Sequence, residues 1–254
     1  MTEASAIGVD VGSTAVKVVA VDAAGALLAR RLEPTDPRID RQVGRLLAEV
    51  RAEVGSDLPL AATGYGRKRV PGARVFTEIT CHARGAFARA RRPALLVDMG
   101  GQDTKVIRLG PGGEVVDFAM NDRCAAGTGR FLEVILGRLQ VPLEGLAERV
   151  ARTSRAVPIS NTCTVFAESE VISLVAAGEP LDGIVKGLHA ALASRVAALA
   201  RPREGDEVLM SGGVALNGAM VAALAEALGR PVQVLPEPQL VGALGAALSA
   251  AREA

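Results

Sequence analysis

The sequence has little excess charge of either sign, few cysteines and no long uninterrupted apolar run. Its formal net charge is +1, which gives no reason to expect nucleic acid or an acidic membrane surface as a partner. The first residues lack a signal-peptide pattern, and no apolar run reaches the ~18–20 residues that span a bilayer. We therefore expect no membrane segment and a cytoplasmic location.

Cysteine is scarce, with 3 in the chain. An odd number of cysteines without a secretory signal argues against a disulfide framework and favours reduced thiols. The remaining composition, with 49% hydrophobic and 22% charged residues among 254, is that of an ordinary globular protein. A chain of this length forms one large domain or two modest ones.

The chain contains an internal repeat. Residues 7–28, IGVDVGSTAVKVVAVDAAGALL, align without gaps on residues 95–116, LLVDMGGQDTKVIRLGPGGEVV. The offset of 88 residues places Asp10 on Asp98. Further identical pairs include Gly12 and Gly100, Lys17 and Lys105, Val18 and Val106, and Gly25 and Gly113. Chance rarely places Asp, Gly, Lys and a hairpin Gly in one register.

Each copy reads as an apolar strand, a sharp Asp-x-Gly turn, a second strand, a glycine-containing hairpin and a third strand. We predict an α/β fold of two related lobes, 1–92 and 93–254, in which the C-terminal helix can return to the first lobe. Between the repeats, Asp36 and Pro37 predict the N-cap and first turn of a helix that runs to about Val54.

The Asp-x-Gly turns suit phosphate binding. Glycine lets the backbone approach a ligand closely, and successive N–H groups form an anion-binding concavity. A carboxylate at the strand end, Asp10 or Asp98, can hold a hydrated Mg²⁺ beside a polyphosphate. One such turn is weak evidence, whereas two in register predict a clamp that grips a triphosphate from both sides.

Two cysteines precede apolar helical runs. Cys124 lies in MNDRCAAGTGR and Cys163 in ISNTCTVFAESEVIS. A helix N-terminus favours negative charge, so it lowers a thiol's pKa and suits it to bind metal. Spacing alone leaves small buried residues in tight turns as an equal alternative. Cys81 and His82 lie within a predicted helix, where packing is favoured over a metal site.

A third glycine-rich segment, SGGVALN, lies between a strand and a helix. Paired glycines there suit the base or ribose of a nucleotide, with Asn217 as a polar contact. His189, on an alanine-rich helix, is predicted to be a packing or surface histidine.

These motifs resemble known ones. IGVDVGSTAVK, LVDMGGQDTKVI and MSGGVALN are similar to the two phosphate motifs and the adenosine motif of the actin, sugar-kinase and chaperone ATPase superfamily. Within it, ATGYGR, TEITCHARGA and the two cysteine blocks closely resemble the activators of 2-hydroxyacyl-CoA dehydratases, with benzoyl-CoA reductase ATPase subunits as near relatives. The resemblance covers essentially the whole chain.

The resemblance implies a homodimeric ATPase that uses ATP, ADP and Mg²⁺ and carries one [4Fe–4S] cluster on its two-fold axis, with Cys124 and Cys163 of each subunit as ligands. It implies ferredoxin or flavodoxin as electron donor, and an acyl-CoA dehydratase or reductase component as the partner that receives one electron. Asp10, Asp98 and Gln102 would be catalytic. The nucleotide site would comprise Gly12, Ser13, Thr14, Ala15, Val16, Lys17, Gly100, Gly101, Asp103, Gly127, Gly129, Gly212, Gly213, Asn217 and Gln239.

Three alternatives stay open. The chain could be the ATPase subunit of a benzoyl-CoA reductase-type complex. It could be a small-molecule kinase of the same fold, which would need a second-substrate pocket with its own base and would leave the cysteine blocks without a purpose. It could also be a nucleotide-gated binding module without a visible-absorbing cluster.

Overall fold

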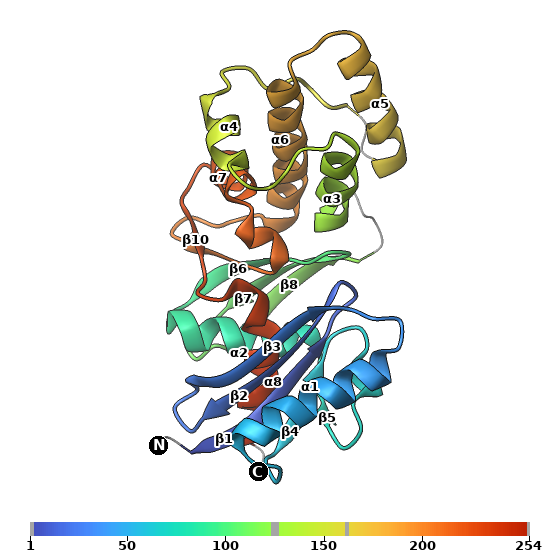
Figure 1. Ribbon diagram of the computed structural model, residues 1–254. Coiled ribbons are helices and arrows are strands. Elements are labelled where there is room, and N and C mark those ends of the chain that lie inside the picture. The colour runs from blue at the N-terminus through green and yellow to red at the C-terminus, as the bar shows by residue number, and fades with distance from the viewer. Residues whose placement is uncertain (1–2, 123–126, 161–162, 253–254) are drawn as a thin grey trace. The chain divides into compact units, whose positions relative to one another are not determined.

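The computed structural model describes residues 3–122, 127–160 and 163–252. Contacts divide the chain into two compact units (Figure 1), each described here in turn. The first comprises Met1–Pro93, Ile107–Asp117 and Leu235–Ala254, and the second comprises Ala94–Val106 and Phe118–Val234. The predicted division at residues 92 and 93 stays a prediction.

Two sheets of five strands organise the chain. The first has the order β3-β2-β1-β4-β5 and consists of β1 (Ala4–Val11), β2 (Ala15–Asp22), β3 (Leu27–Pro34), β4 (Leu60–Thr63) and β5 (Arg74–Val75). The second has the order β10-β9-β6-β7-β8 and consists of β6 (Ala94–Met99), β7 (Thr104–Leu109), β8 (Val115–Asn121), β9 (Val208–Ser211) and β10 (Val232–Val234).

Helices complete both units. Those of the first are α1 (Ile39–Val54), α2 (Glu78–Ala90) and α8 (Val241–Arg252), with the short 3-10 turns η1 (Arg67–Arg69) and η4 (Pro238–Leu240). Those of the second are α3 (Gly129–Arg138), α4 (Leu146–Arg152), α5 (Thr164–Ala176), α6 (Leu181–Ala200) and α7 (Gly218–Leu228), with η3 (Gly213–Leu216).

The predicted repeat is confirmed in three dimensions. Strands β1, β2 and β3 occupy in their sheet the positions that β6, β7 and β8 occupy in theirs. The hairpins close with equivalent bonds, because Gly25 N donates to Asp22 O and Gly113 N donates to Gly110 O, each at 3.0 Å. The equivalence continues beyond the aligned segment, since β4 and β9 both lie parallel to the first strand of their repeat.

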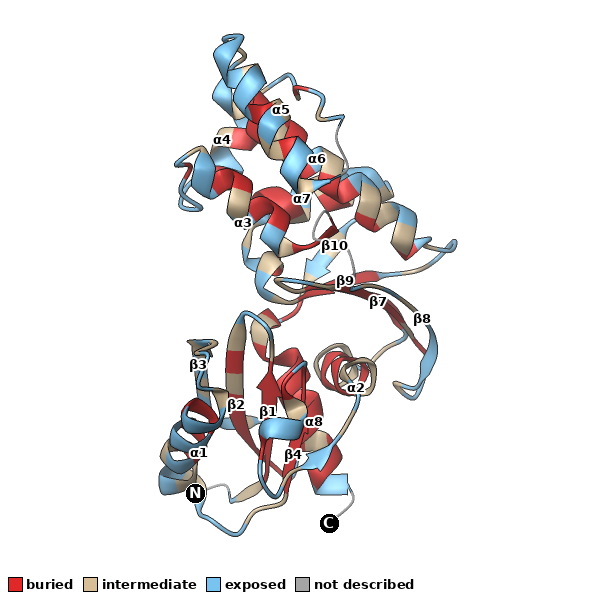
Figure 2. Ribbon diagram, turned by 90° about the vertical axis from the view of Figure 1, so that its right-hand side faces the viewer, coloured by how far each residue is buried: buried red, intermediate tan, exposed pale blue. Residues whose placement is uncertain are grey.

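Both faces of the first sheet are covered (Figure 2). Because side chains alternate along a strand, Ile7 and Val9 pack in one core with α1, while Ala6 packs in another with α8. Asp10 follows Ala6 in this alternation, so its carboxylate lies on the α8 side.

The start of α1 differs from the prediction. The helix begins at Ile39 with Arg38 as N-cap, two residues after the expected proline. Asp36 does not cap it, because its Oδ1 accepts a hydrogen bond from Arg38 N at 2.7 Å and its carboxylate pairs with the Arg38 guanidinium. The Asp36 carboxylate therefore accepts hydrogen bonds within this local turn and does not cap the first N–H groups of α1.

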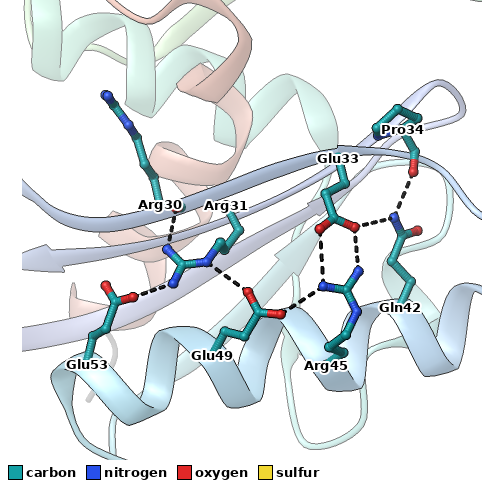
Figure 3. A network of polar contacts seen from close by, with 8 residues as sticks. All are labelled: Arg30, Arg31, Glu33, Pro34, Gln42, Arg45, Glu49 and Glu53. Carbon is teal, nitrogen blue, oxygen red and sulfur yellow. Dashed lines mark hydrogen bonds and ion pairs between the residues drawn. The ribbon is translucent and has the colours of Figure 1, made fainter.

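A surface ion network joins α1 to β3 (Figure 3). Arg45 pairs with Glu33 and with Glu49, and Arg31 pairs with Glu49 and Glu53. The hydrogen bond from Arg45 lowers the pKa of Glu33, and those from Arg31 and Arg45 lower the pKa of Glu49. Because these groups are exposed, the network orients α1 more than it stabilises the unit.

Helix α6 corrects the expectation about apolar runs. With 20 residues and a mean hydropathy of 1.2 over its most apolar window, it is long and apolar enough to span a membrane. However, its residues Ile184, Leu188, Leu192 and Val196 lie in the core of the second unit. Packing therefore accounts for its composition.

Helix α8 approaches α2 through a glycine. A Cβ on Gly245 would lie 1.7 Å from the carbonyl oxygen of Cys81. In contrast, a Cβ on Gly44, in the exposed part of α1, would meet nothing within 4 Å.

These two glycines give a matched test. Gly245→Ala should destabilise the protein by about 3 kcal/mol, because the backbones of two packed helices must separate. Gly44→Ala should stabilise it by about 1 kcal/mol, because alanine costs less entropy in a helix. Denaturant unfolding followed by circular dichroism measures both. Equal stabilities for the two variants would contradict the close packing of α8 on α2.

Candidate functional site

The first phosphate-type turn joins β1 to β2. Lys17 Nζ lies 3.0 Å from Asp10 Oδ2, and Gly12 N donates to Ala15 O at 3.0 Å. Thr35, which follows β3, donates from its hydroxyl to Gly12 O at 2.8 Å. The turn is thus closed by its own backbone and held in place by the end of the sheet's outer strand.

The second turn repeats this geometry between β6 and β7. Gly100 N donates to Asp103 O at 2.9 Å, as Gly12 N does to Ala15 O. Lys105 Nζ lies 3.5 Å from Asp98 Oδ2 and 2.5 Å from Asp103 Oδ2. The duplicated sequence therefore produces a duplicated carboxylate–lysine pair at the start of each turn.

The two lysines differ in surroundings. The Lys105 side chain is 2% exposed and lies between two carboxylates, whereas the Lys17 side chain is 15% exposed and pairs with Asp10. The aligned residue of Asp103 in the first repeat is Ala15. Breaking a buried ion pair leaves an uncompensated charge, so Lys105 is held more firmly than Lys17. Lys17 is accordingly the better candidate to contact a phosphate.

The repeat also includes a hydroxyl and a glycine beside each carboxylate, which sequence comparison alone missed. Thr63 is the cross-strand neighbour of Asp10, and Ser211 is that of Asp98. Ser211 Oγ donates to Asp98 Oδ1 at 2.7 Å. The next residues, Gly64 and Gly212, have φ of 91° and 88°, which favour glycine. The sequence contains this equivalence as the dipeptides TG and SG, each at the end of a short strand.

Helix α3 begins on the second turn. Gly129 N donates to Gly100 O at 2.9 Å, and Arg130 N donates to Gly101 O at 2.8 Å. In addition, Thr104 donates from its hydroxyl to Gly127 O at 2.6 Å. The first N–H groups of a helix have no partner within it, so the carbonyls of the turn satisfy them directly. A displacement of this turn consequently displaces the start of α3.

Asn217 ends the segment of the third glycine motif. Its Oδ1 accepts from Met220 N at 3.2 Å and caps α7, while its Nδ2 lies 3.0 Å from His189 Nε2. The His189 side chain is fully buried, which excludes the surface position that the sequence also allowed. Burial lowers the pKa of His189.

The remaining predicted residues fall into two groups. Exposed or half-buried are Ser13, Thr14 and Ala15 at the first turn, Gln102 at the second, Gly213 in η3 and Gln239 in η4. The exception is Val16, whose side chain is buried in the core shared with α1, so it can offer a ligand only its backbone.

The cysteines differ in exposure. Cys163 is exposed and is the N-cap of α5, as predicted, whereas Cys124 lies outside the described residues. Burial raises the pKa of Cys81 to about 11, so it is a poor thiolate donor. Within 3–122, 127–160 and 163–252, no three His, Cys, Asp or Glu side chains gather as a metal site would require.

His82, which the sequence assigned to packing, lies close to the first carboxylate. A Cβ on Gly242 would be 2.8 Å from His82 Nε2 and 3.1 Å from Asp10 Oδ2. Both side chains therefore approach the same position on α8. In the sequence, His82 lies in the segment TEITCHARGA, and nothing in that segment associated His82 with Asp10.

Solved structures identify the class of protein. The glucokinase of Streptomyces griseus, determined with glucose and an ATP analogue, aligns over 99% of this chain and 100% of its own with a TM-score of 0.61. At 15% identity this likeness concerns the fold alone. The activator of 2-hydroxyisocaproyl-CoA dehydratase from Clostridium difficile, with bound ADPNP, is 37% identical, covers 98% of this chain and 95% of that one, and has a TM-score of 0.89. The predicted actin-like, sugar-kinase α/β fold is confirmed.

Sequence relatives identify the family. Residues 7–250 match the BadF/BadG/BcrA/BcrD ATPase family, to which this chain belongs. The (R)-2-hydroxyglutaryl-CoA dehydratase activating ATPase of Acidaminococcus fermentans is 41% identical over 98% of this chain and 97% of its own. The activator of lactoyl-CoA dehydratase of Anaerotignum propionicum is 48% identical over 74% of each chain. One subunit of the benzoyl-CoA reductase of Thauera aromatica is 30% identical over 95% of this chain and 91% of its own. The predicted ATPase activity is thereby confirmed.

The duplicated carboxylates give the second prediction. Asp10→Asn and Asp98→Asn should each lower the rate of ATP hydrolysis by ~10²-fold, as expected when a group that stabilises transition-state charge is lost. Steady-state phosphate release, with folding checked by circular dichroism, measures the effect. Asp57→Asn, in an exposed loop, is the control and should hydrolyse ATP as the unmodified protein does. Full activity in Asp98→Asn would contradict a role for the second turn.

Proposed function

We propose that this protein is an ATP-dependent activator that passes one electron at a time to an iron–sulfur enzyme of the 2-hydroxyacyl-CoA dehydratase type. The relatives with 48% and 41% identity are named as an activator and an activating ATPase of such dehydratases, whereas the benzoyl-CoA reductase relative is 30% identical. This ranking favours a dehydratase over a reductase as the partner. The electron donor would be ferredoxin or flavodoxin, in the cytoplasm.

The observation that carries the proposal is the attachment of α3 to the second turn. Gly100 and Gly101 accept hydrogen bonds from the first two residues of a helix that follows Cys124 by a few positions. A kinase needs its phosphate turns to face a second substrate. An activator needs its phosphate turns to control a redox group. The hydrogen bonds between the second turn and α3 would link the phosphate site to the segment that contains Cys124.

The surroundings of Cys163 support the proposal of a [4Fe–4S] cluster shared by two copies of the chain. Cys163 is exposed at the N-terminus of α5, and no acidic residue lies in the first turn of that helix. The helix dipole there favours a net-negative group. A cubane takes four thiolates, so Cys124 and Cys163 of two chains would hold it. When bound, the cluster would supply one-electron transfer.

An exposed apolar surface beside Cys163 supports a homodimer. Val165 is 68% exposed and Phe166 is 63% exposed, in the first turn of α5. Large exposed apolar side chains next to each other mark interaction sites. A second copy that covers them would bring its own Cys163 to the same place.

ATP would bind with its phosphates on the amides of the two turns. Asp10 and Asp98 would hold the hydrated Mg²⁺ and orient the attacking water, and Lys17 would neutralise phosphate charge. Gln102, exposed at the second turn, would contact the water or the γ-phosphate. Loss of the γ-phosphate would shift the Gly100–Gly101 carbonyls, and their hydrogen bonds would transmit this shift to α3.

The cysteine assignment gives the third prediction. Cys163→Ser should lose iron and the broad visible absorbance near 400 nm, and should weaken dimerisation, because the cluster bridges two chains. Cys81→Ala should retain both, because this thiol is buried and stays protonated. Iron analysis and gel filtration of anaerobically purified protein measure the outcome. Loss of iron in Cys81→Ala with retention in Cys163→Ser would reverse the assignment.

A further inference from the structure

A chain of hydrogen bonds runs through the core of the second unit to the third glycine motif. It begins in α6, where His189 Nδ1 lies 2.8 Å from Val185 O. It continues from His189 Nε2 to Asn217 Nδ2 at 3.0 Å, and from Asn217 Oδ1 to Met220 N at 3.2 Å. Both His189 ring nitrogens are thus engaged within the protein.

The partners fix where the protons lie. The carbonyl of Val185 can only accept, so His189 Nδ1 carries a proton. Met220 N can only donate, so the side-chain oxygen of Asn217 faces it and the amide nitrogen faces His189. That nitrogen can only donate, so His189 Nε2 must be unprotonated. The arrangement therefore requires a neutral imidazole in the Nδ1–H tautomer.

Asn217 in turn determines the path of the glycine motif. Its backbone N donates to Val214 O at 2.9 Å, and Ala215 N donates to Gly212 O at 3.3 Å. At the other end of the segment, Ser211 is fixed by its hydrogen bond to Asp98. The six residues from Gly212 to Asn217 are therefore held at both ends, by Asp98 on the sheet and by His189 in the helical core.

We propose that His189 is a positioning residue for the nucleoside part of ATP, because it holds Asn217 and thereby the Gly212–Gly213 turn in place. This inference rests on the proposed ATP binding and on the prediction from the sequence that the nucleoside lies at that turn. His189 itself is fully buried, so it would not contact the ligand directly. It would act on the ligand through Asn217 and the turn.

Packing alone does not account for a histidine at this position. Its neighbours along α6, Val185, Leu188, Leu192 and Ala193, are all buried and apolar. Burying an imidazole costs more than burying leucine unless its nitrogens are bonded. Capping of α7 does not require His189 either, because the cap uses only the side-chain oxygen of Asn217. What His189 adds is a fixed orientation of the Asn217 amide.

Two substitutions separate the hydrogen bond from packing. His189→Gln retains an acceptor that can reach Asn217, whereas His189→Leu fills a similar volume without one. With titration calorimetry, His189→Leu should bind ATP and ADP about tenfold more weakly, equivalent to about 1.4 kcal/mol. Inorganic tripolyphosphate should bind within about twofold of its normal affinity. His189→Gln should bind ATP within about threefold of the unmodified protein.

A third variant tests the same hydrogen bond if His189→Leu does not fold. Asn217→Ser preserves a good N-cap for α7 but removes the amide that donates to His189 Nε2. It should also weaken ATP binding about tenfold, and its KM should change more than its kcat. Nitrogen-15 NMR of the unmodified protein should report the Nδ1–H tautomer for His189.

Several results would overturn the inference. One is normal ATP affinity in His189→Leu or, if that variant does not fold, in Asn217→Ser. The others are equal losses of ATP affinity in His189→Leu and His189→Gln, a parallel loss of tripolyphosphate binding, and an Nε2–H tautomer of His189. A failure of the unmodified protein to bind ATP would instead refute the proposed function, so the two failures are distinguishable.

Discussion

Each sheet of this protein ends its first strand in a buried carboxylate that a lysine of the next strand neutralises. Asp10 and Asp98 are 5% and 2% exposed, and burying a carboxylate is costly unless a cation and hydrogen-bond donors pair with it. The lysine can reach back only if the chain turns sharply after the carboxylate, and this turn is the candidate phosphate site. The ion pair thus determines both the turn and the place where charge is available to a ligand.

The two copies of this arrangement have diverged in a way that suggests different tasks. In the first unit Lys17 keeps some exposure, so its turn can respond to phosphate. In the second unit Lys105 is enclosed by Asp98 and Asp103, and the carbonyls of the turn hold α3. The first turn is suited to contact a ligand, and the second to pass a displacement to α3, which follows Cys124.

The repeat, the strand and helix order and the α/β class could be predicted from the sequence, because Asp, Gly and Lys recur in one register. The Thr63–Ser211 equivalence could not, because β4 and β9 follow segments of different length and share only a hydroxyl and a glycine. The role of His189 could not be predicted either, because the sequence around it does not indicate that its side chain contacts Asn217. The start of α1 was wrong because Arg38 competed for Asp36.

We propose that nucleotide state alters the surroundings of a cluster held by Cys124 and Cys163, through the second turn and α3. The most direct measurement is the midpoint potential of the cluster in anaerobic protein without nucleotide, with ADP, and with a non-hydrolysable ATP analogue. We predict a different potential in the ATP-analogue state, where a shift of ~59 mV corresponds to a tenfold change in equilibrium for one electron. Identical potentials in all three states would make the cluster a structural link between subunits and contradict the account.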